Sequence, residues 1–175
     1  MAIIHSFAPI AGDRAKILIL GSMPGEASLA ANQYYAHQRN AFWPIIAPLL
    51  LIQADASYQE KITALQSSHL ALWDVFKSCE RIGSLDTQIR SDNYTINDFA
   101  SLFSSYKHIS HIFFNGGTAE RYFTRHVLPC CNLDAIQCLR LPSTSPANAR
   151  LSFNDKRKIW HEHIYSVLNR FSKPS

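Results

Sequence analysis

The chain has 175 residues, of which 47% are hydrophobic and 17% charged, and its formal net charge is +4. This balance excludes an intrinsically disordered chain and suffices for a single domain, residues 1–175, with a hydrophobic core. No apolar run approaches the ~20 residues that a membrane-spanning helix needs, and the first residues lack the pattern of a secretory signal. We therefore expect a cytoplasmic protein without membrane association. The mild positive charge permits an anionic partner.

Strand-like and helix-like segments alternate along the chain. An apolar run begins at Ile17 and ends at Gly21, which is typical of a buried strand that meets a tight turn. Three further strands are expected at His69–Phe76, His108–Asn115 and Ala135–Leu141. Helices are expected at Arg39–Leu51 with Pro44 in the first turn, at Ser57–Gln66, Ile96–Tyr106 and Thr118–Val127, and from Asn154 or Asp155 onward. Residues 78–90 are expected to form a loop with a short helix, and Ser172–Ser175 a frayed tail.

This alternation predicts an α/β fold, a three-layer α/β/α sandwich with a central four-stranded parallel sheet. Right-handed crossovers place the carboxyl ends of all four strands at one edge. Three polar segments follow strand ends, namely Gly21–Gly25, Asn115–Gly117 and Leu141–Asn148. Because ligands of open parallel sheets bind at this edge, the sequence predicts a site there. The alternative reading of the first segment and its continuation to Trp43 is a long surface loop with an aromatic anchor.

The four cysteines, Cys79, Cys130, Cys131 and Cys138, form no CxxC pair. Adjacent Cys130 and Cys131 suit neither a zinc site nor a disulfide framework, so reduced thiols are expected. An iron–sulfur cluster that uses all four is left open by their number alone, and the spacing gives it little support. We expect no metal and no other cofactor.

Four motifs, taken together, carry a family resemblance. The segments GSMPG, YYAHQRNAFW, FFNGG and LPSTSPANA, at these spacings, resemble the uracil-DNA glycosylase superfamily, and most closely its hypoxanthine-type branch, the DNA-deoxyinosine glycosylases. The resemblance runs from Ile17 to about Trp160. It implies a uracil-DNA glycosylase-like fold and a role in DNA base-excision repair. Such an enzyme extrudes a deaminated base from DNA into a pocket and cleaves its N-glycosidic bond.

Two departures from the superfamily pattern bear on catalysis. Ser22 and Met23 stand where the best-known uracil enzymes have Gln-Asp before the proline, and Ser143 stands where the second motif commonly has His. The resemblance leaves Asn40 as the candidate catalytic residue. Its carbonyl oxygen could orient water and stabilise positive charge that develops on the sugar. The alternative role for Asn40 is a helix N-cap.

The resemblance also assigns residues to the base and to the DNA. The expected base-binding residues are Ser22, Met23, Phe42, Asn115 and Ser143, with Phe42 as the stacking ring and Asn115 as the amide that reads the base edge. The alternatives are a core phenylalanine and a turn asparagine. The expected DNA-binding residues are Gly25, Ser145, Pro146, Ala147, Asn148 and Arg150. Lys156–Lys158 is either a phosphate-binding cluster or a solvated helix start.

The hypothesis from the sequence is a monomeric, monofunctional DNA glycosylase that acts on nucleoid DNA and releases a deaminated base, hypoxanthine in the first place. No lysine lies in the matched motifs to form a Schiff base, so lyase activity is not expected. One alternative is uracil or another deaminated base as the principal substrate. Another is a DNA- or nucleotide-binding domain that kept this fold and lost the chemistry. A generic small-ligand enzyme is disfavoured, because the sequence has no phosphate-binding glycine motif.

Overall fold

The central sheet of the protein is parallel and has four strands. The structure, a computed structural model, describes residues 3–171, so the expected frayed tail lies outside the described residues. The strands lie in the order β3-β2-β6-β7. Their bounds are Leu70–Asp74 for β3, Ile17–Gly21 for β2, His111–Asn115 for β6 and Gln137–Leu141 for β7. Gly21 pairs with Asp74 and Asn115 with Leu141 in register, so the strand ends meet at one edge as predicted.

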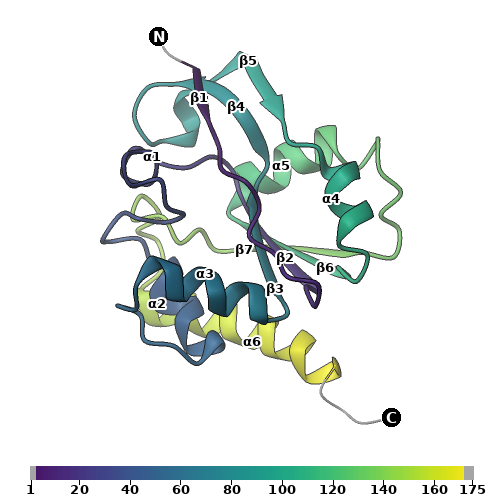
Figure 1. Cartoon of the computed structure of the whole chain (residues 1–175). Coiled ribbons are helices and arrows are strands. Elements are labelled where there is room, and N and C mark those ends of the chain that lie inside the picture. The colour runs from purple at the N-terminus through teal and green to yellow at the C-terminus, as the bar shows by residue number, and fades with distance from the viewer. Residues whose placement is uncertain (1–2, 172–175) are drawn as a thin grey trace.

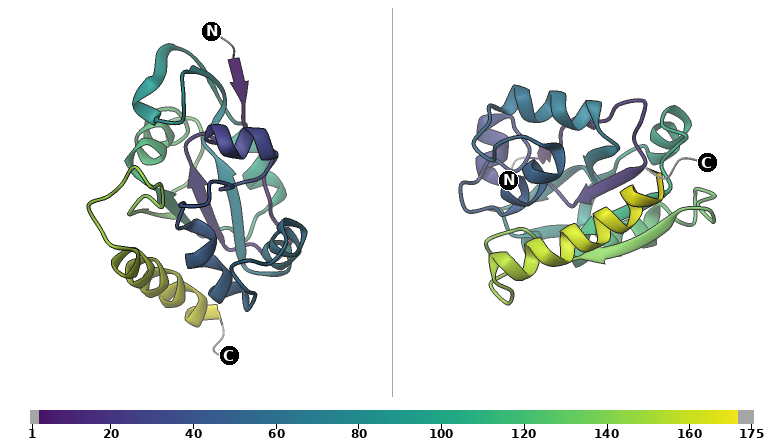
Figure 2. Two further views of the ribbon diagram at one scale, coloured as in Figure 1. Left: turned by 90° about the vertical axis from the view of Figure 1, so that its left-hand side faces the viewer. Right: turned by 90° about the horizontal axis from the view of Figure 1, so that it is seen from below.

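Helices cover both faces of this sheet (Figure 1), which confirms the predicted three-layer α/β/α fold. One face carries α2 (Phe42–Ile46), the 3₁₀ helix η1 (Ala47–Leu50), α3 (Tyr58–Ser67) and α6 (Phe153–Phe171), and the other carries α4 (Phe99–Ser105) and α5 (Gly117–His126). Alternation within β2 explains the layers, because Ile17 and Ile19 pack on the first face and Leu18 and Leu20 on the second. Seen from below in Figure 2, α6 runs lengthwise across the sheet. No helix within residues 3–171 has the length and apolar character needed to cross a membrane.

A second sheet, which the sequence analysis did not predict, extends from the carboxyl end of β3. It is antiparallel with the order β1-β4-β5, and its strands are β1 (Ile3–His5), β4 (Phe76–Arg81) and β5 (Ile89–Ile96). The prediction of one strand to Phe76 was therefore wrong. The predicted loop with a short helix over 78–90 is limited to the middle of that range, because both of its ends belong to strands. Only Val75 separates β3 from β4, and β5 is mostly exposed and polar, so neither strand gives a separate apolar signal.

Helix boundaries follow capping residues. Ser57 caps α3, and its side chain and that of Glu60 form the predicted reciprocal capping box. Ser152 and Asp155 make the same reciprocal bonds, so α6 begins at Phe153 rather than after Asn154 or Asp155. Asp98 caps α4, which therefore begins later than the predicted Ile96.

The helix predicted at Arg39–Leu51 is shorter than expected. It begins at Phe42, with Pro44 in the first turn as predicted, and it tightens into η1 at Ala47. A short helix, α1 (Glu26–Ala31), follows β2, and the 3₁₀ helix η2 (Asp86–Gln88) precedes β5. Both begin in loops at the carboxyl edge of the parallel sheet, and these loops build the site.

Candidate active site

A cavity of about 940 Å³ opens at the carboxyl edge of the parallel sheet. Its walls are the loops that follow β2, β4 and β7, with Asp74 and Asn115 at the ends of β3 and β6. Every residue that the sequence analysis assigned to the site lines this cavity except Phe42. The topology therefore brings the separate motifs together, as the shared strand edge predicts.

Phe42 does not occupy the position predicted for a stacking residue. Its side chain is fully buried, and its ring packs edge-on against Trp43 and Trp160 in the core. Tyr35 lies on the Phe42 ring, with 3.9 Å between ring centroids and 18° between ring planes, and Tyr35 lines the cavity. The expectation for Phe42 is thus corrected to the core alternative. Tyr34 and Tyr35 are the two tyrosines that line the cavity.

Asn115 is held by hydrogen bonds on both ends of its amide. Its nitrogen donates to Tyr35 Oη (3.1 Å) and to Thr144 Oγ1 (2.9 Å), and its oxygen accepts from the Thr144 backbone N–H (2.8 Å). Both N–H groups are used, so the capacity left to Asn115 is a lone pair on its oxygen. The residue ties the end of β6 to the loop after β7 and fixes the Tyr35 hydroxyl.

Asn40 is half-buried and lines the cavity just before α2. Its side-chain oxygen accepts from the backbone N–H of Phe42 at 3.0 Å. The N-cap of α2 is Ala41, so the capping alternative for Asn40 is replaced by a turn that its side chain closes two residues ahead. This bond fixes the amide plane at the cavity wall and leaves a second lone pair on the oxygen.

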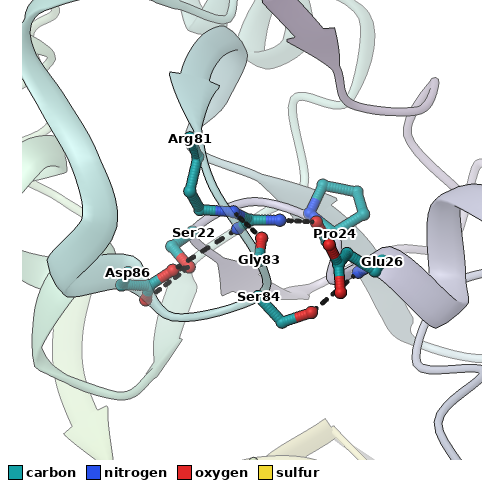
Figure 3. A network of polar contacts seen from close by, with 7 residues as sticks. All are labelled: Ser22, Pro24, Glu26, Arg81, Gly83, Ser84 and Asp86. Carbon is teal, nitrogen blue, oxygen red and sulfur yellow. Dashed lines mark hydrogen bonds and ion pairs between the residues drawn. The ribbon is translucent and has the colours of Figure 1, made fainter. Parts of the chain in front are cut away.

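Two loops of the cavity wall are joined by a buried arginine on β4 (Figure 3). Arg81 donates from Nε to Gly83 O at 2.8 Å and from Nη2 to Pro24 O, and its Nη1 lies 3.9 Å from Asp86. Asp86 in turn accepts from the Ser22 hydroxyl with both carboxylate oxygens, at 2.8 and 2.7 Å. The hydroxyl of Ser22, which was expected to bind the base, therefore holds the loop after β4.

Two acidic residues of the cavity, Asp74 and Asp86, were missed by sequence reasoning. Asp74 ends β3, is 3% exposed, and its Oδ2 has no hydrogen-bond partner. Burial, followed by the nearby Asp86 charge, raises the pKa of Asp74 to about 8 against the opposing effect of Arg81. Burial also raises the pKa of Asp86, which the Ser22 hydroxyl and Arg81 oppose. A polar residue that ends an apolar strand was a usable signal for Asp74, whereas Asp86 gave none.

A lysine on α6 holds the loop after β7 by hydrogen bonds to its backbone. Lys156 is 5% exposed, and its Nζ donates to Asn148 O at 2.7 Å and to Ser145 O at 3.4 Å. Lys156 is therefore neither a surface phosphate contact nor a solvated residue, and burial lowers its pKa. A hollow of about 470 Å³ adjoins the loop and is lined by Arg140 and Arg150 among others. Arg150 is thus the cationic side chain that both hollows share.

Metal ligands are not grouped in the part of the chain that the structure describes. Within residues 3–171 no three His, Cys, Asp or Glu side chains are arranged to hold a metal ion. All four cysteines are free thiols. None of them lines the cavity, where the side chains available for chemistry are carboxyl, amide, hydroxyl, imidazole, guanidinium and aromatic groups.

A parallel α/β sheet with a deep cavity at the carboxyl ends of its strands is the architecture of proteins that bind a ligand at that edge. This chain belongs to the uracil DNA glycosylase superfamily, whose family model matches residues 9–163. It is 32% identical over 159 residues to the hypoxanthine DNA glycosylase of Methanosarcina barkeri, covering 90% of this chain and 96% of that protein. It is 34% identical over 151 residues to the hypoxanthine DNA glycosylase of Methanosarcina acetivorans, covering 86% and 91%.

The fold is also similar to a solved structure. A candidate uracil DNA glycosylase from Methanosarcina acetivorans, solved by solution NMR, matches with a TM-score of 0.74 and 31% sequence identity. The match covers 92% of this chain and 98% of that one. The family membership expected from the four motifs is confirmed.

Proposed function

We propose that this protein is a monofunctional DNA glycosylase that hydrolyses the N-glycosidic bond of hypoxanthine at deoxyinosine and leaves an abasic site. The observation that carries the proposal is the cavity at the strand ends, which is lined by residues of all four family motifs. The names of the two Methanosarcina relatives support hypoxanthine as the base. No lysine lines the cavity, which supports hydrolysis without a Schiff-base intermediate.

The base has to leave the duplex and enter the cavity before its bond can be cut. Stacking on the Tyr35 ring recovers part of the lost base stacking, about 1–3 kcal/mol per base. Asn40 is the proposed catalytic residue. The free lone pair of its oxygen holds the attacking water or stabilises positive charge on the sugar. Met23 and Ser143 complete the wall around the base.

The DNA strand is held by the rim of the cavity. Gly25 lies on the rim beside the loop after β7, whose rim residues are Ser145, Pro146, Ala147, Asn148 and Arg150. Backbone amides and the Arg150 guanidinium are suited to phosphate oxygens, and they position the strand without reading its sequence. We propose that the protein acts as a single-domain monomer in the cytoplasm, on nucleoid DNA, which gel filtration and cell fractionation can test.

Uracil is the second candidate substrate, because the solved relative with the same fold is a candidate uracil DNA glycosylase. A panel of labelled duplexes, each with one deoxyinosine, deoxyuridine or deoxyxanthosine, separates the candidates. We expect abasic sites, revealed by alkali, to form fastest at deoxyinosine. A chain that binds these duplexes and cleaves none of them would be the non-catalytic binding domain instead.

The role of Asn40 is tested by single-turnover rates of Asn40→Ala. We expect most base release to be lost while DNA binding persists, and a stability cost of about 1 kcal/mol from the lost turn. Asn132→Ala is the matched control, because Asn132 is exposed outside the cavity and also accepts from a backbone N–H two residues ahead. A parental rate for Asn40→Ala would remove Asn40 from the mechanism.

A further inference from the structure

Most polar side chains that line the cavity already have hydrogen-bond partners in the protein. The amide of Asn115 has used both N–H groups, and the Ser22 hydroxyl donates to Asp86. The Ser143 hydroxyl accepts from the Ser145 backbone N–H at 3.2 Å. These bonds fix the polar groups that shape the cavity.

Asp74 differs from these groups, because one of its buried carboxyl oxygens has no hydrogen-bond partner in the described part of the chain. Three buried side-chain atoms within residues 3–171 have no hydrogen-bond partner, and they belong to Asp74, Arg81 and His111. Of these three residues, Asp74 alone lines the cavity. A buried polar atom without a partner is rare in native proteins, and a ligand that enters the cavity can supply the missing bond. The Asp74 carboxyl lies at the end of β3, where ligands of parallel sheets are bound.

The surroundings of Asp74 favour the uncharged acid. Burial disfavours the carboxylate, and Asp86 on η2 adds a like charge, whereas Arg81 on β4 is the opposing cation. The other titratable groups whose charge is coupled to Asp74 are the hydroxyls of Tyr34 and Tyr35, and burial raises the pKa of both. The pKa of Asp74 is raised to about 8, so at neutral pH the carboxyl carries its proton and is a hydrogen-bond donor.

We propose that Asp74, as an uncharged acid, donates a hydrogen bond to the flipped base and stabilises that base as it departs. This role rests on the proposed glycosylase function. Asp74 is thereby a catalytic residue beside Asn40, and it acts on the base whereas Asn40 acts on the sugar.

The chemistry of the step explains the need for a neutral donor. When the glycosidic C–N bond breaks, its electron pair stays on the base, which gains negative charge, while the sugar gains positive charge. Water adds to the sugar carbon, and the proton that the water releases neutralises the departed base. A donor aimed at the base lowers the barrier, and such donors are worth about 10²–10³ in rate. An ionised Asp74 would instead place a like charge beside the base.

The test is the pH dependence of single-turnover base release from a deoxyinosine duplex, for the parental protein, Asp74→Asn and Asp74→Ala. The parental rate should fall as pH rises through about 8, the pKa of Asp74. Asp74→Asn keeps a donor of the same shape that cannot ionise, so it should stay within about tenfold of the parental rate at neutral pH and lose the fall. Asp74→Ala has no donor and should be slower by about 10²-fold or more.

The Asp74→Asn variant distinguishes a neutral donor at Asp74 from a carboxylate that acts as a base. If Asp74 activated water as a carboxylate, the parental rate would rise with pH and Asp74→Asn would be inactive, which would overturn the proposal. Ionisation of the substrate base affects all three proteins equally, so it cannot produce a difference between their profiles. The profiles of Asp86→Asn and His37→Ala identify any contribution from these two titratable groups of the cavity.

Failure of this inference is separable from failure of the proposed function. A parental protein that releases no hypoxanthine contradicts the glycosylase function itself. A parental protein that releases hypoxanthine, with Asp74→Ala at the parental rate, contradicts only the role of Asp74. Urea unfolding of each variant shows whether a low rate reflects lost folding.

Discussion

Gly21 and Asp74 are paired across β2 and β3, and a Cβ atom on Gly21 would lie 2.4 Å from Oδ1 of Asp74. The same atom would lie 2.8 Å from Tyr35 Oη. Non-bonded carbon and oxygen atoms do not approach so closely without displacement, and Gly21 itself belongs to a fully buried strand. The carboxyl of Asp74 and the hydroxyl of Tyr35 can thus face the cavity together because Gly21 has no side chain.

Gly21→Ala should therefore reduce base release by about tenfold or more, because the added methyl group displaces the Asp74 carboxyl or the Tyr35 ring. Single-turnover rates at neutral pH measure the effect. Gly83→Ala is the control, because Gly83 lies in the loop before η2 and a Cβ atom added there would contact nothing. At its φ of +69° the alanine strains only the backbone. Equal loss of rate in the two variants, at equal loss of stability, would contradict a role for the close approach.

Ionisation of Asp74 should make the protein less stable as pH rises. The folded state raises the pKa of this carboxyl from 3.8 to about 8, so the unfolded chain releases the proton first. Its contribution to stability is complete below pH 3.8 and is lost as pH rises to about 8, by at most about 1.4 kcal/mol per pH unit. Asp74→Asn should therefore gain stability over the parental protein from pH 5 to pH 8.

Urea unfolding at several pH values measures this difference. The exposed Asp13→Asn serves as the control for substituting an aspartate elsewhere on the surface. A constant difference between the parental protein and Asp74→Asn across this range would show that Asp74 is ionised in the folded protein, and it would also weaken its role as a donor.

Arg81 should be essential for holding the two loops of the cavity wall together. Arg81→Met leaves the Asp86 carboxylate without its cation and the Pro24 and Gly83 carbonyls without their donor, which should cost about 3–5 kcal/mol of unfolding free energy. Denaturant unfolding measures the loss. In the double variant with Asp86→Asn the loss should be smaller than the sum of the two single losses, and strictly additive losses would argue against a coupled pair.

Substitutions of Phe42 and Tyr35 should have different effects, the first on the stability of the protein and the second on base binding. Phe42→Ala opens a cavity in the core and should cost about 3–5 kcal/mol of unfolding free energy. Tyr35→Leu retains apolar volume against Phe42 and removes the ring, so it should mainly weaken binding of a flipped base, by about 1–3 kcal/mol. Fluorescence of a base analogue beside the lesion reports flipping. The reverse assignment would follow if Phe42→Leu impaired flipping in a fully folded protein.

Lys156 and Arg150 should respond differently to salt. Arg150→Ala should reduce the slope of log affinity against log salt by about 0.9 if it contacts one phosphate. Lys156→Met should leave the slope unchanged, because its Nζ is bonded to the backbone of the loop after β7, and should lower affinity by loosening that loop. Fluorescence anisotropy with an uncleavable duplex at several salt concentrations gives both values. A reduced slope for Lys156→Met would indicate that Lys156 contacts a phosphate.

The sequence alone determined the layers of the fold and the edge that carries the site. The alternation at Ile17–Leu20, the turn residues at Gly21 and Gly116 and the proline after Leu141 are local signals, and parallel topology converts them into one edge by a rule that needs no coordinates. The family motifs likewise located the parts of the cavity that follow β2, β6 and β7. Local sequence patterns were enough to predict those elements whose structure depends on the residues of one short segment.

Only the tertiary structure decided what the individual side chains can do. Tyr35 covers Phe42, Lys156 turns inward under a loop, and Asp86 reaches Ser22 from 64 residues away. The predicted strand His69–Phe76 gave Asp74 no position at a strand end. The charge state of Asp74 depends on its burial and on Arg81 and Asp86. Hydrogen bonding and ionisation depend on which distant groups share a dry space, and that arrangement exists only once the chain has folded.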